Sequence, residues 1–507
     1  MSTPKVVILF LMLCQTLTAQ VEEILCKVIE EGTRYPVAYA TIQFENSGNG
    51  VIANIEGDFR IPYQYKLDKD TIVISCIGYE TKRVELQTLE DRNINVIILK
   101  PKIEELEQVV ISGKKVQKWE SGYTLVKKAI ANIPNNYPNQ SFSSVGYYRD
   151  YQIINDDYYN LNEAIVESFD AGFDTDIMMD SYNQNALYKY SENKEFSRDS
   201  SLVKAYDGES KYIENTTLSG QGGNELGILN IHDPIRNFEQ LSFSFVYVFK
   251  KRFLTNHEFE TMKRVYLDDE PIYEIRFDAL ERLTGVSHKA SGKIYISERN
   301  YAIHKLEYQV YETKNVDDPL FEVKIEYAPK NDKMYLNYIT FNNRFVVSSS
   351  FSFDITKIDY DANEKAFYIK FNNDVQPSSV QKRDFRFKYQ KKKLVVKDFE
   401  IIDEKNIKVN IAEWSIPDTI DEATNMSAFE YRIKNIYDVA DRKLFKSPEI
   451  TGYQFREFFI QEIFESKLKP MSLEYMQKSK PLSEAPVNQN RNKETYWLNT
   501  PLKTVNN

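Results

Sequence analysis

Two side chains in the middle of the chain have the spacing of metal ligands. His304 and Glu307 stand in a His-x-x-Glu order, which can offer an imidazole and a carboxylate to zinc. Apolar and polar residues alternate from Ala302 to Val310, which predicts a β-strand. Side chains three apart on a strand point to opposite faces, so we expect a half-buried histidine here and no metal site.

Other catalytic patterns are missing from the sequence. His257-Glu258 has no second histidine four residues on, and no Gly-x-Ser-x-Gly nucleophile turn occurs. The other two histidines, His232 and His288, belong to no such pattern. The sequence therefore predicts no catalytic residue, no metal ligand and no cofactor, and hence a protein that is not an enzyme.

Two cysteines, Cys26 and Cys76, remain if the N-terminal segment described below is removed. Both fall in expected strands of one small domain. An even pair in an exported protein can form a disulfide, whereas thiols on separate strands pack as small buried apolar groups. Both alternatives stay open, because the sequence does not tell whether the Cα atoms lie within about 7 Å.

Four aspartates form an acidic stretch, namely Asp170, Asp174, Asp176 and Asp180. Calcium prefers cages of oxygen ligands, but the order of an EF-hand loop is missing here. We therefore expect a solvated loop.

A basic segment with interleaved aromatic residues spans residues 382–393. Its aromatic residues are Phe385, Phe387 and Tyr389, and its basic residues are Lys382, Arg383, Arg386, Lys388, Lys391, Lys392 and Lys393. In a strand the rings would face inwards and the charges outwards, which protects an exposed sheet edge. A surface for a polyanion or a surface glycan is the alternative, although the chain as a whole is acidic.

The elements that must position these residues are mostly β-strands. The chain has 507 residues, of which 42% are hydrophobic, 13% are aromatic and 17 are Gly. The length suggests about three or four domains, the aromatic residues favour strands, and the low glycine content excludes a collagen-like chain. A net charge of −10 argues against nucleic acid as a partner, because such binding depends on neutralising phosphates.

Residues 1–19 have the pattern of a secretory signal peptide. Lys5 precedes an apolar run at residues 6–13, which is too short for a transmembrane helix, and cleavage is expected after Ala19. Lipid attachment at Cys14 is an alternative, against which the large preceding residue speaks. No later run reaches about 18 apolar residues, so we expect no transmembrane helix in the mature chain. The expected location is the periplasm, the outer membrane or the cell surface.

Residues 20–100 are expected to form a small β-sandwich, because short alternating strands are separated by turn signals such as the one at Gly57. The blocks Pro36–Ile42, Gly50–Phe59 and Ser75–Glu80 occur in an order that resembles the carboxypeptidase regulatory-like domain. That domain is a transthyretin-like seven-stranded sandwich at the N-terminus of many exported and outer-membrane proteins of Bacteroidetes. The resemblance implies folding, display or contact with a partner, and no peptidase activity.

A linker at residues 101–120 leads to a central domain at residues 121–348. A helix is predicted over Tyr123 to Ile133, where the apolar residues share one stripe and Pro134 ends it. An antiparallel sheet is expected from strands at Ser144–Tyr151, Leu241–Phe249, Ile272–Phe277, Gly292–Ile296, Ala302–Tyr311, Phe321–Tyr327 and Tyr338–Val347. The strand–turn–strand pattern at residues 292–308 resembles hairpins of lipoprotein-carrier-type half-barrels of the periplasm.

Two further parts of the chain resemble known families. Gly146–Asp150 and Asn162–Ala164 are similar to an uncharacterised region that follows this sandwich in other exported proteins of Bacteroidetes. Within residues 349–447, Phe367–Val380 and Tyr431–Leu444 resemble an early strand and the last strand of bacterial Ig-like domains. This second resemblance implies a spacer or an adhesive sandwich.

The last segment, residues 448–507, is expected to hold an amphipathic helix over about 453–468 and an irregular tail. The residues with helical spacing are Phe455, Phe458, Phe459, Ile463 and Leu468. The expected fold class is therefore mainly β and multidomain: a transthyretin-like β-sandwich, an antiparallel-sheet domain, an Ig-like sandwich and a C-terminal helix.

Three functions remain open. The first is a non-enzymatic scaffold or binding module of the cell envelope, with an envelope protein or a surface glycan as partner and peripheral association with the outer membrane. The second is a periplasmic carrier of a lipid or another apolar ligand, which requires an enclosed apolar cavity in the central domain. The third is a hydrolase, which requires two carboxylates about 5–10 Å apart in a cleft.

Overall fold

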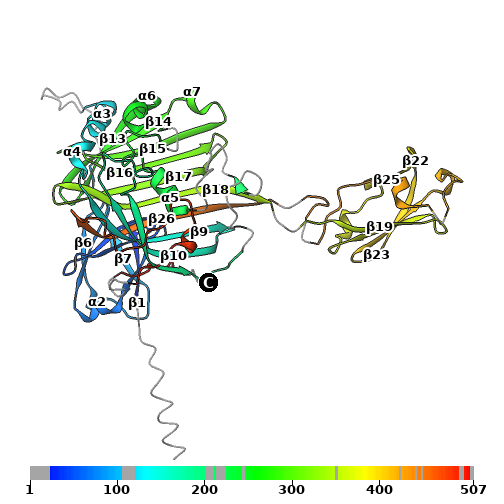
Figure 1. The fold of residues 1–507 in the computed structure, drawn as a ribbon, viewed down its shortest axis with the longest axis horizontal. Coiled ribbons are helices and arrows are strands. Elements are labelled where there is room, and N and C mark those ends of the chain that lie inside the picture. The colour runs from blue at the N-terminus through cyan, green and yellow to red at the C-terminus, as the bar shows by residue number, and fades with distance from the viewer. Residues whose placement is uncertain are drawn as a thin grey trace, which may run out of the picture. The chain divides into compact units, whose positions relative to one another are not determined.

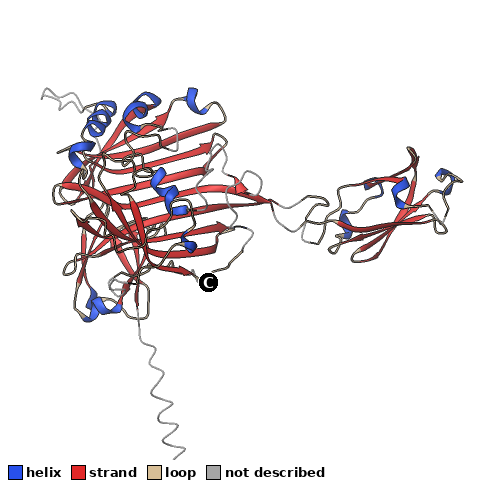
Figure 2. Ribbon diagram, viewed as in Figure 1, coloured by secondary structure: helices blue, strands red, loops and turns tan. Residues whose placement is uncertain are grey.

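The computed structural model describes residues 23–104, 120–199, 202, 211–212, 224–242, 246–348, 352–421, 424–439, 442–446, 449–489 and 496–502. Strands dominate this part of the chain, which confirms the mainly β, multidomain class (Figure 2). The chain divides into a first unit of Met1–Asp199, Ile213–Arg344 and Tyr453–Asn507, and a second unit of Ser200–Tyr212 and Phe345–Gly452. The expected signal peptide with Cys14, and most of the expected linker, lie outside the described residues.

The N-terminal part of the first unit consists of two small sheets around one core (Figure 1). Its elements are β1 (Glu23–Glu30), β2 (Thr41–Phe44), β3 (Gly50–Ile52), β4 (Asp58–Pro62), α2 (Tyr63–Leu67), β5 (Thr71–Ser75), β6 (Lys82–Glu85), a 3-10 turn at Leu86–Thr88 and β7 (Asn95–Leu99). The sheet orders are β4-β1-β7 and β3-β2-β5-β6. Gly57, before β4, has a φ of +75°, and a Cβ there would lie 2.4 Å from the carbonyl oxygen of Val28, so this turn requires glycine.

A twelve-stranded sheet with antiparallel neighbours forms the centre of the structure (Figure 1). Its strands are β8 (Ile103–Glu104), β9 (Phe142–Ile154), β10 (Asp157–Asp170), β11 (Gln184–Glu192), β12 (Lys211–Tyr212), β13 (His257–Leu267), β14 (Glu270–Ala279), β15 (His288–Ser297), β16 (Ile303–Glu312), β17 (Asn315–Lys330), β18 (Lys333–Ser348) and β26 (Glu449–Glu465). The order is β11-β10-β9-β26-β18-β17-β16-β15-β14-β13-β8, with β12 beside β18.

β26 lies where the C-terminal helix was expected, so that prediction was wrong. Phe458 of β26 covers Gly146 on one face of the sheet, and Phe459 stacks near Tyr39 on the other. Because both faces are buried, apolar residues occur at consecutive positions and imitate helical spacing. A register shift between Ile460 and Glu462 disturbs the alternation further.

The helices of the described chain are short. Besides α2, they are α3 (Gly122–Ala131), α4 (Ile133–Asn136), α5 (Glu225–Ile231), α6 (Leu254–Asn256) and α7 (Glu281–Thr284), with a π-helical turn at Phe249–Phe253. α3 agrees with the helix predicted at residues 123–133, and the Ser121 hydroxyl caps it by accepting from the backbone N–H of Thr124. None of the described helices has the length and apolar character that crossing a bilayer requires.

Several of these helical segments pack on one face of the central sheet, termed the helical face. Gly122 of α3 contacts Ile275, Phe253 packs edge-on against Phe277, and the residue after α5, His232, stacks on Phe341. These contacts give the sheet an apolar layer on this side.

The described residues of the segment 241–249, namely 241–242 and 246–249, do not form the strand that was expected there. Leu241 makes an isolated antiparallel bridge with Val248, and a π-helical turn follows from Phe249. Leu241 and Val248 thus pair with each other within the segment, and neither belongs to a strand of the central sheet.

The N-terminal domain packs on the opposite face, termed the domain face. Tyr39 stacks on Tyr338 with ring centroids 5.1 Å apart, and Ile77 packs beside Ile272 and Tyr295. The central sheet is therefore buried on both faces over much of its area.

The C-terminal tail crosses back to the N-terminal domain. Its one described regular element is a 3-10 turn at Leu482–Glu484. Trp497 is buried in the N-terminal core, where its ring packs edge-on against Phe44 and its Nε1 donates to the carbonyl of Arg60. The end of the chain thus helps to complete the core of its beginning.

The second unit is built from two sheets that share one core, in the orders β19-β20-β24-β23 and β22-β21-β25. Its elements are β19 (Ile355–Asp361), β20 (Ala366–Phe371), β21 (Phe385–Tyr389), β22 (Lys392–Leu394), β23 (Val396–Asp403), β24 (Asn406–Ile411) and β25 (Phe429–Ile433), with 3-10 turns at Pro377–Ser379, Lys382–Asp384, Glu413–Ser415 and Met426–Ala428. Phe367 and Phe387 stack between the sheets with ring centroids 3.9 Å apart. The resemblance to Ig-like domains remains a prediction.

One ion pair is wholly buried on the domain face. Arg149 of β9 and Glu457 of β26 lie directly opposite each other, with Nε bonded to Oε2 and both side chains fully buried. The guanidinium lies 5.3 Å and 5.5 Å from the ring centroids of Tyr151 and Phe459. Burial raises the pKa of Glu457, and the Arg149 charge opposes that rise. Within the described residues, Nη1 and Nη2 of Arg149 have no hydrogen-bond partner, so each charge depends mainly on the other.

We expect Glu457→Gln to lower the free energy of unfolding by about 3–5 kcal/mol, because it leaves the Arg149 charge buried and uncompensated. The double variant Arg149→Met/Glu457→Met should lie much closer to the wild type, since it removes both charges. Urea denaturation of the three proteins measures this. Equal losses in the single and double variants would contradict the assignment of the pair.

Candidate ligand-binding site

A small cavity lies on the helical face, between α5 and the strands β9, β10, β17 and β18. Its volume is about 70 Å³. Its apolar lining comprises Phe142, Phe169, Phe173, Ile177, Leu229, Leu336, Ile339 and Phe458. Its polar lining includes Asp170, Asn183, Asp233, Arg236, Tyr327 and Lys478. The cavity thus combines an apolar interior with several charged groups, whose availability decides what it can do.

α5 supplies one wall of the cavity. Asn224 caps this helix by accepting a hydrogen bond from the backbone of its first turn, and Leu229 is buried towards the cavity. The helix ends at His232, whose ring stacks on Phe341 with centroids 3.7 Å apart. This contact holds the turn that follows, residues 233–237, against the sheet.

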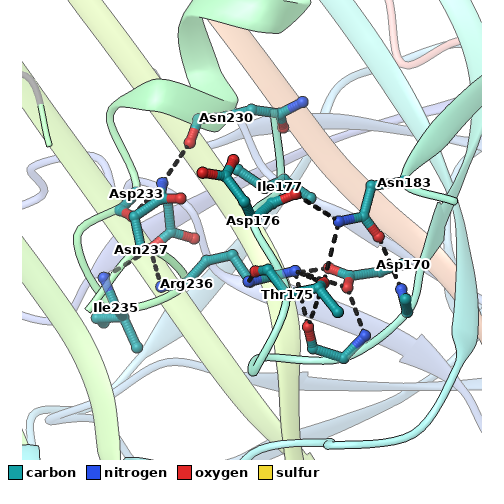
Figure 3. A network of polar contacts seen from close by, with 12 residues as sticks. Asp170, Thr175, Asp176, Ile177, Asn183, Asn230, Asp233, Ile235, Arg236 and Asn237 are labelled. Atoms are coloured by element: carbon teal, nitrogen blue, oxygen red, sulfur yellow. Dashed lines mark hydrogen bonds and ion pairs between the residues drawn. The ribbon is translucent and has the colours of Figure 1, made fainter. Parts of the chain in front are cut away.

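Arg236 in that turn is fully engaged by neighbouring groups (Figure 3). Its Nε and Nη2 donate to the two carboxylate oxygens of Asp170 at 2.8 and 2.9 Å. Its Nη1 donates to the carbonyl of Thr175 at 2.7 Å, and Nη2 also donates to the carbonyl of Gly172 at 2.8 Å. Both members of the pair are buried, so the guanidinium joins the end of β10 to the turn after α5.

Asp233 is engaged in the same way. One oxygen accepts from the backbone N–H groups of Ile235 and Arg236, each at 2.9 Å, and the other accepts from the Tyr327 hydroxyl at 2.6 Å. Burial raises the pKa of Asp233, and these donors oppose the rise. The carboxylate closes the turn and holds it on β17.

The acidic stretch expected as a solvated loop is a loop after β10, but only Asp174 of its four aspartates is exposed. Asp176 accepts from the backbone N–H of Met178, and Asp180 accepts from that of Tyr182, so both shape local turns. Asp170 differs, because it is buried at the end of β10. The acidic side chains therefore organise the loop and do not converge on a common point.

Lys478 approaches the cavity from the C-terminal tail. Its Nζ donates to the carbonyl oxygens of Ile177 and Met178 at 3.1 and 2.8 Å. Burial lowers its pKa. The tail thus holds the loop at residues 171–183 through the backbone of that loop, as Arg236 does through Gly172 and Thr175.

These contacts limit the chemistry of the cavity. Asp170 and Asp233 are the two carboxylates of its lining, and the backbone, Arg236 and Tyr327 use them. A general acid or base must be able to exchange a proton with a substrate, and a saturated carboxylate is poorly placed to do so. What the cavity offers to a ligand is its apolar interior.

His304 and Glu307 have separate partners in the structure. The Nε2 of buried His304 lies 3.7 Å from the Glu270 carboxylate, and Glu307 pairs with Lys305 at 2.7 Å. The neighbouring His304 imidazole is the main cause that lowers the pKa of Glu270 to about 2. Within the described residues, no three His, Cys, Asp or Glu side chains are grouped so that they could hold a metal.

The two cysteines are free thiols in the structure. Cys26 lies on β1, and Cys76 follows β5 of the other small sheet. Burial raises the pKa of both thiols to about 12, so neither is a ready nucleophile at neutral pH. In the structure they are separate thiols at different sheets, with Cys26 buried and Cys76 partly exposed.

A shallow groove of about 400 Å³ lies on the domain face, across β14 to β17. Its charges are paired with neighbours, as Lys293 is with Glu274 at 3.0 Å and Lys324 is with Glu322 at 3.0 Å. Such a ladder of opposite charges stabilises the sheet and leaves no single charge for a ligand.

Sequence reasoning did not identify Asp233, Arg236 or Lys478. The available signal is a turn at Asp233-Pro234, which marks the end of a helix. Nothing in the sequence around Arg236 indicates that its partner is Asp170, because the two residues are 66 positions apart.

Comparison with known proteins identifies one part of the chain. Residues 26–111 match the family model of the CarboxypepD_reg-like domain, which supports the expected N-terminal domain. The comparison with curated proteins gives no match.

Two solved structures are similar to part of the chain. A LolA superfamily protein from Nitrosomonas europaea covers 44% of this chain and 86% of its own, at 13% identity and a TM-score of 0.19. A DUF1329 family protein from Desulfovibrio piger has the same coverage, at 8% identity and a TM-score of 0.21.

Removing Arg236 should loosen the wall of the cavity. We expect Arg236→Leu to cost about 3–5 kcal/mol, because Asp170 stays buried without its partner. The amides of residues 171–183 should exchange faster with deuterium, as measured by mass spectrometry. The exposed Arg276, which pairs with Asp278, provides a control: Arg276→Leu should leave this exchange unchanged. Unaltered exchange in Arg236→Leu would show that the loop is held by other contacts.

His257 should make the fold sensitive to mild acid. Its Nδ1 contacts the Phe253 carbonyl at 2.9 Å, and the ring lies among Phe253, Phe277 and Tyr308, so burial lowers its pKa from 6.5 to about 4. Below about pH 6.5, His257 is protonated in the unfolded chain but stays neutral in the folded chain. The free energy of unfolding therefore falls as the pH drops towards 4.

We expect His257→Phe to remove about 2–3 kcal/mol of the stability difference between pH 7.5 and pH 4.5. Urea unfolding of both proteins at the two pH values measures it. His288 provides the control, because it is the first residue of β15 and is partly exposed. We expect His288→Phe to leave the pH dependence of the stability unchanged. A pH dependence that is identical in His257→Phe and the wild type would refute the prediction.

Proposed function

We propose that this protein is a non-enzymatic binding module of the cell envelope, exported to the periplasm or the outer membrane. The observation that carries the proposal is the saturation of the cavity: both of its carboxylates are bound by the protein itself. A hydrolase needs at least one carboxyl group that can exchange a proton with its substrate. The N-terminal match to an accessory-type domain supports a role in display or partner contact.

A second candidate is the carriage of an apolar ligand. The lining of the cavity by Phe142, Ile339 and Phe458 favours it. The volume of about 70 Å³ is roughly half that of an apolar cavity that holds benzene, so only a short alkyl group would fit. A longer chain would require the loop at residues 171–183 to move away from Arg236.

Filling the cavity separates the two candidates. A carrier of such a short group should bind hexanoate saturably in isothermal titration calorimetry, and Leu229→Trp should weaken that binding at least tenfold while Leu229→Met, which keeps the volume, changes it less than about twofold. A scaffold should show no saturable uptake in any of the three proteins. Circular dichroism confirms that the variants are folded.

The non-enzymatic assignment has a separate test. The purified mature chain is assayed against envelope esters and glycans in parallel with Asp233→Asn, which keeps the shape of the side chain but removes its proton chemistry. We expect no turnover by either protein. Turnover by the wild type that disappears in Asp233→Asn would overturn the proposal and favour the hydrolase.

A further inference from the structure

A strongly basic surface covers one sheet of the second unit. The sheet β22-β21-β25 and its flanks, residues 382–393 and 429–434, hold nine Lys and Arg against two acidic residues, in a chain whose net charge is −10. The exposed side chains of Arg386, Lys388, Lys393 and Arg432 project from the three strands on one side and are termed the basic face. Positive charge is thus concentrated where the rest of the protein is acidic.

Strand alternation separates the rings of this segment from its charges. In β21, Phe385, Phe387 and Tyr389 are buried in the core, whereas Arg386 and Lys388 between them are exposed. The basic face therefore carries no aromatic platform on its central strand. The one exposed ring of these strands, Tyr431 of β25, lies opposite Phe387 and therefore belongs to the other side of the sheet. Nucleic-acid bases are commonly held by stacking on aromatic rings, so the basic face itself is suited to charge recognition.

Like charges lie directly opposite each other on the basic face. Arg386 pairs in register with Arg432, and Lys388 with Lys393. Opposed like charges destabilise a sheet. The one nearby counter-charge on the strands is Glu430, 3.2 Å from Lys388, since Asp384 is buried and accepts from the backbone N–H of Gln381.

Protection of sheet edges explains only part of this charge. Lys392 and Lys393 lie on β22, an edge strand, where lysine prevents pairing with other chains. β21 is the central strand and is paired on both sides, so Arg386 and Lys388 protect no edge. Their charge serves neither the core nor an edge.

We propose that the basic face binds the phosphate-bearing surface of an anionic membrane. A flat array of Lys and Arg side chains matches a plane of lipid phosphates, and attraction to such a surface adds up over its basic residues and falls off within a Debye length. The inference goes beyond the function proposed above and does not depend on what the cavity binds.

Co-sedimentation of the full mature chain with lipid vesicles tests this. We expect binding to phosphatidylcholine vesicles that contain about 30% phosphatidylglycerol, no binding to pure phosphatidylcholine, and loss of binding when salt rises from about 0.05 M to about 0.3 M. The variant Arg386→Glu/Lys393→Glu should bind at least tenfold more weakly. Each substitution places a carboxylate opposite Arg432 or Lys388, so the variant should be as stable as the wild type and unfolding cannot explain its loss of binding.

Lys357→Glu/Lys405→Glu is the matched control, because it changes the net charge equally on exposed residues at the other sheet of the same unit, and Lys357→Glu likewise places a carboxylate opposite a lysine, Lys370. We expect it to bind anionic vesicles as the wild type does. Three results would overturn the proposal: no sedimentation of the wild type with anionic vesicles, an equal loss in the control, or capture by an acidic polysaccharide such as alginate through the same residues without binding to vesicles.

Discussion

Burial of the central sheet on both faces is the constraint on which the first unit depends. Helices lie on one side and the N-terminal domain on the other, so a charged side chain between these layers loses its water. Such a charge is tolerated only beside a partner. Arg149 meets Glu457 across neighbouring strands on the domain face, and Arg236 meets Asp170 on the helical face. Both pairs join segments that are far apart in the chain.

The same constraint shapes the candidate binding site. The polar groups around the cavity hold the turn after α5 and the loop at residues 171–183 in place, and Lys478 adds the tail to this assembly. Groups that are used to hold the wall are not available for acid–base chemistry. The apolar lining is what remains for recognition of a ligand.

In the second unit, strand alternation separates a buried core from a charged surface. Its rings fill the core between two sheets, and the alternate positions of β21 carry charge to the surface. Because β21 is a central strand, its charged side chains do not protect a sheet edge from pairing with other chains. A small sandwich can therefore have a stable interior and a charged outer face in the same five residues.

The sequence alone determined the elements that are buried on one side. The alternation around His304, the ring and charge pattern of β21, the stripe of α3 and the glycine at the turn before β4 are local signals that appear in the structure, although His304 itself is buried instead of half-buried. Only the tertiary structure decided that β26 is a strand, because burial on both faces erases the period of two. It also decided the pairing of Arg149 with Glu457, 308 residues away, and of Arg236 with Asp170, since contacts between distant segments leave no trace in local spacing.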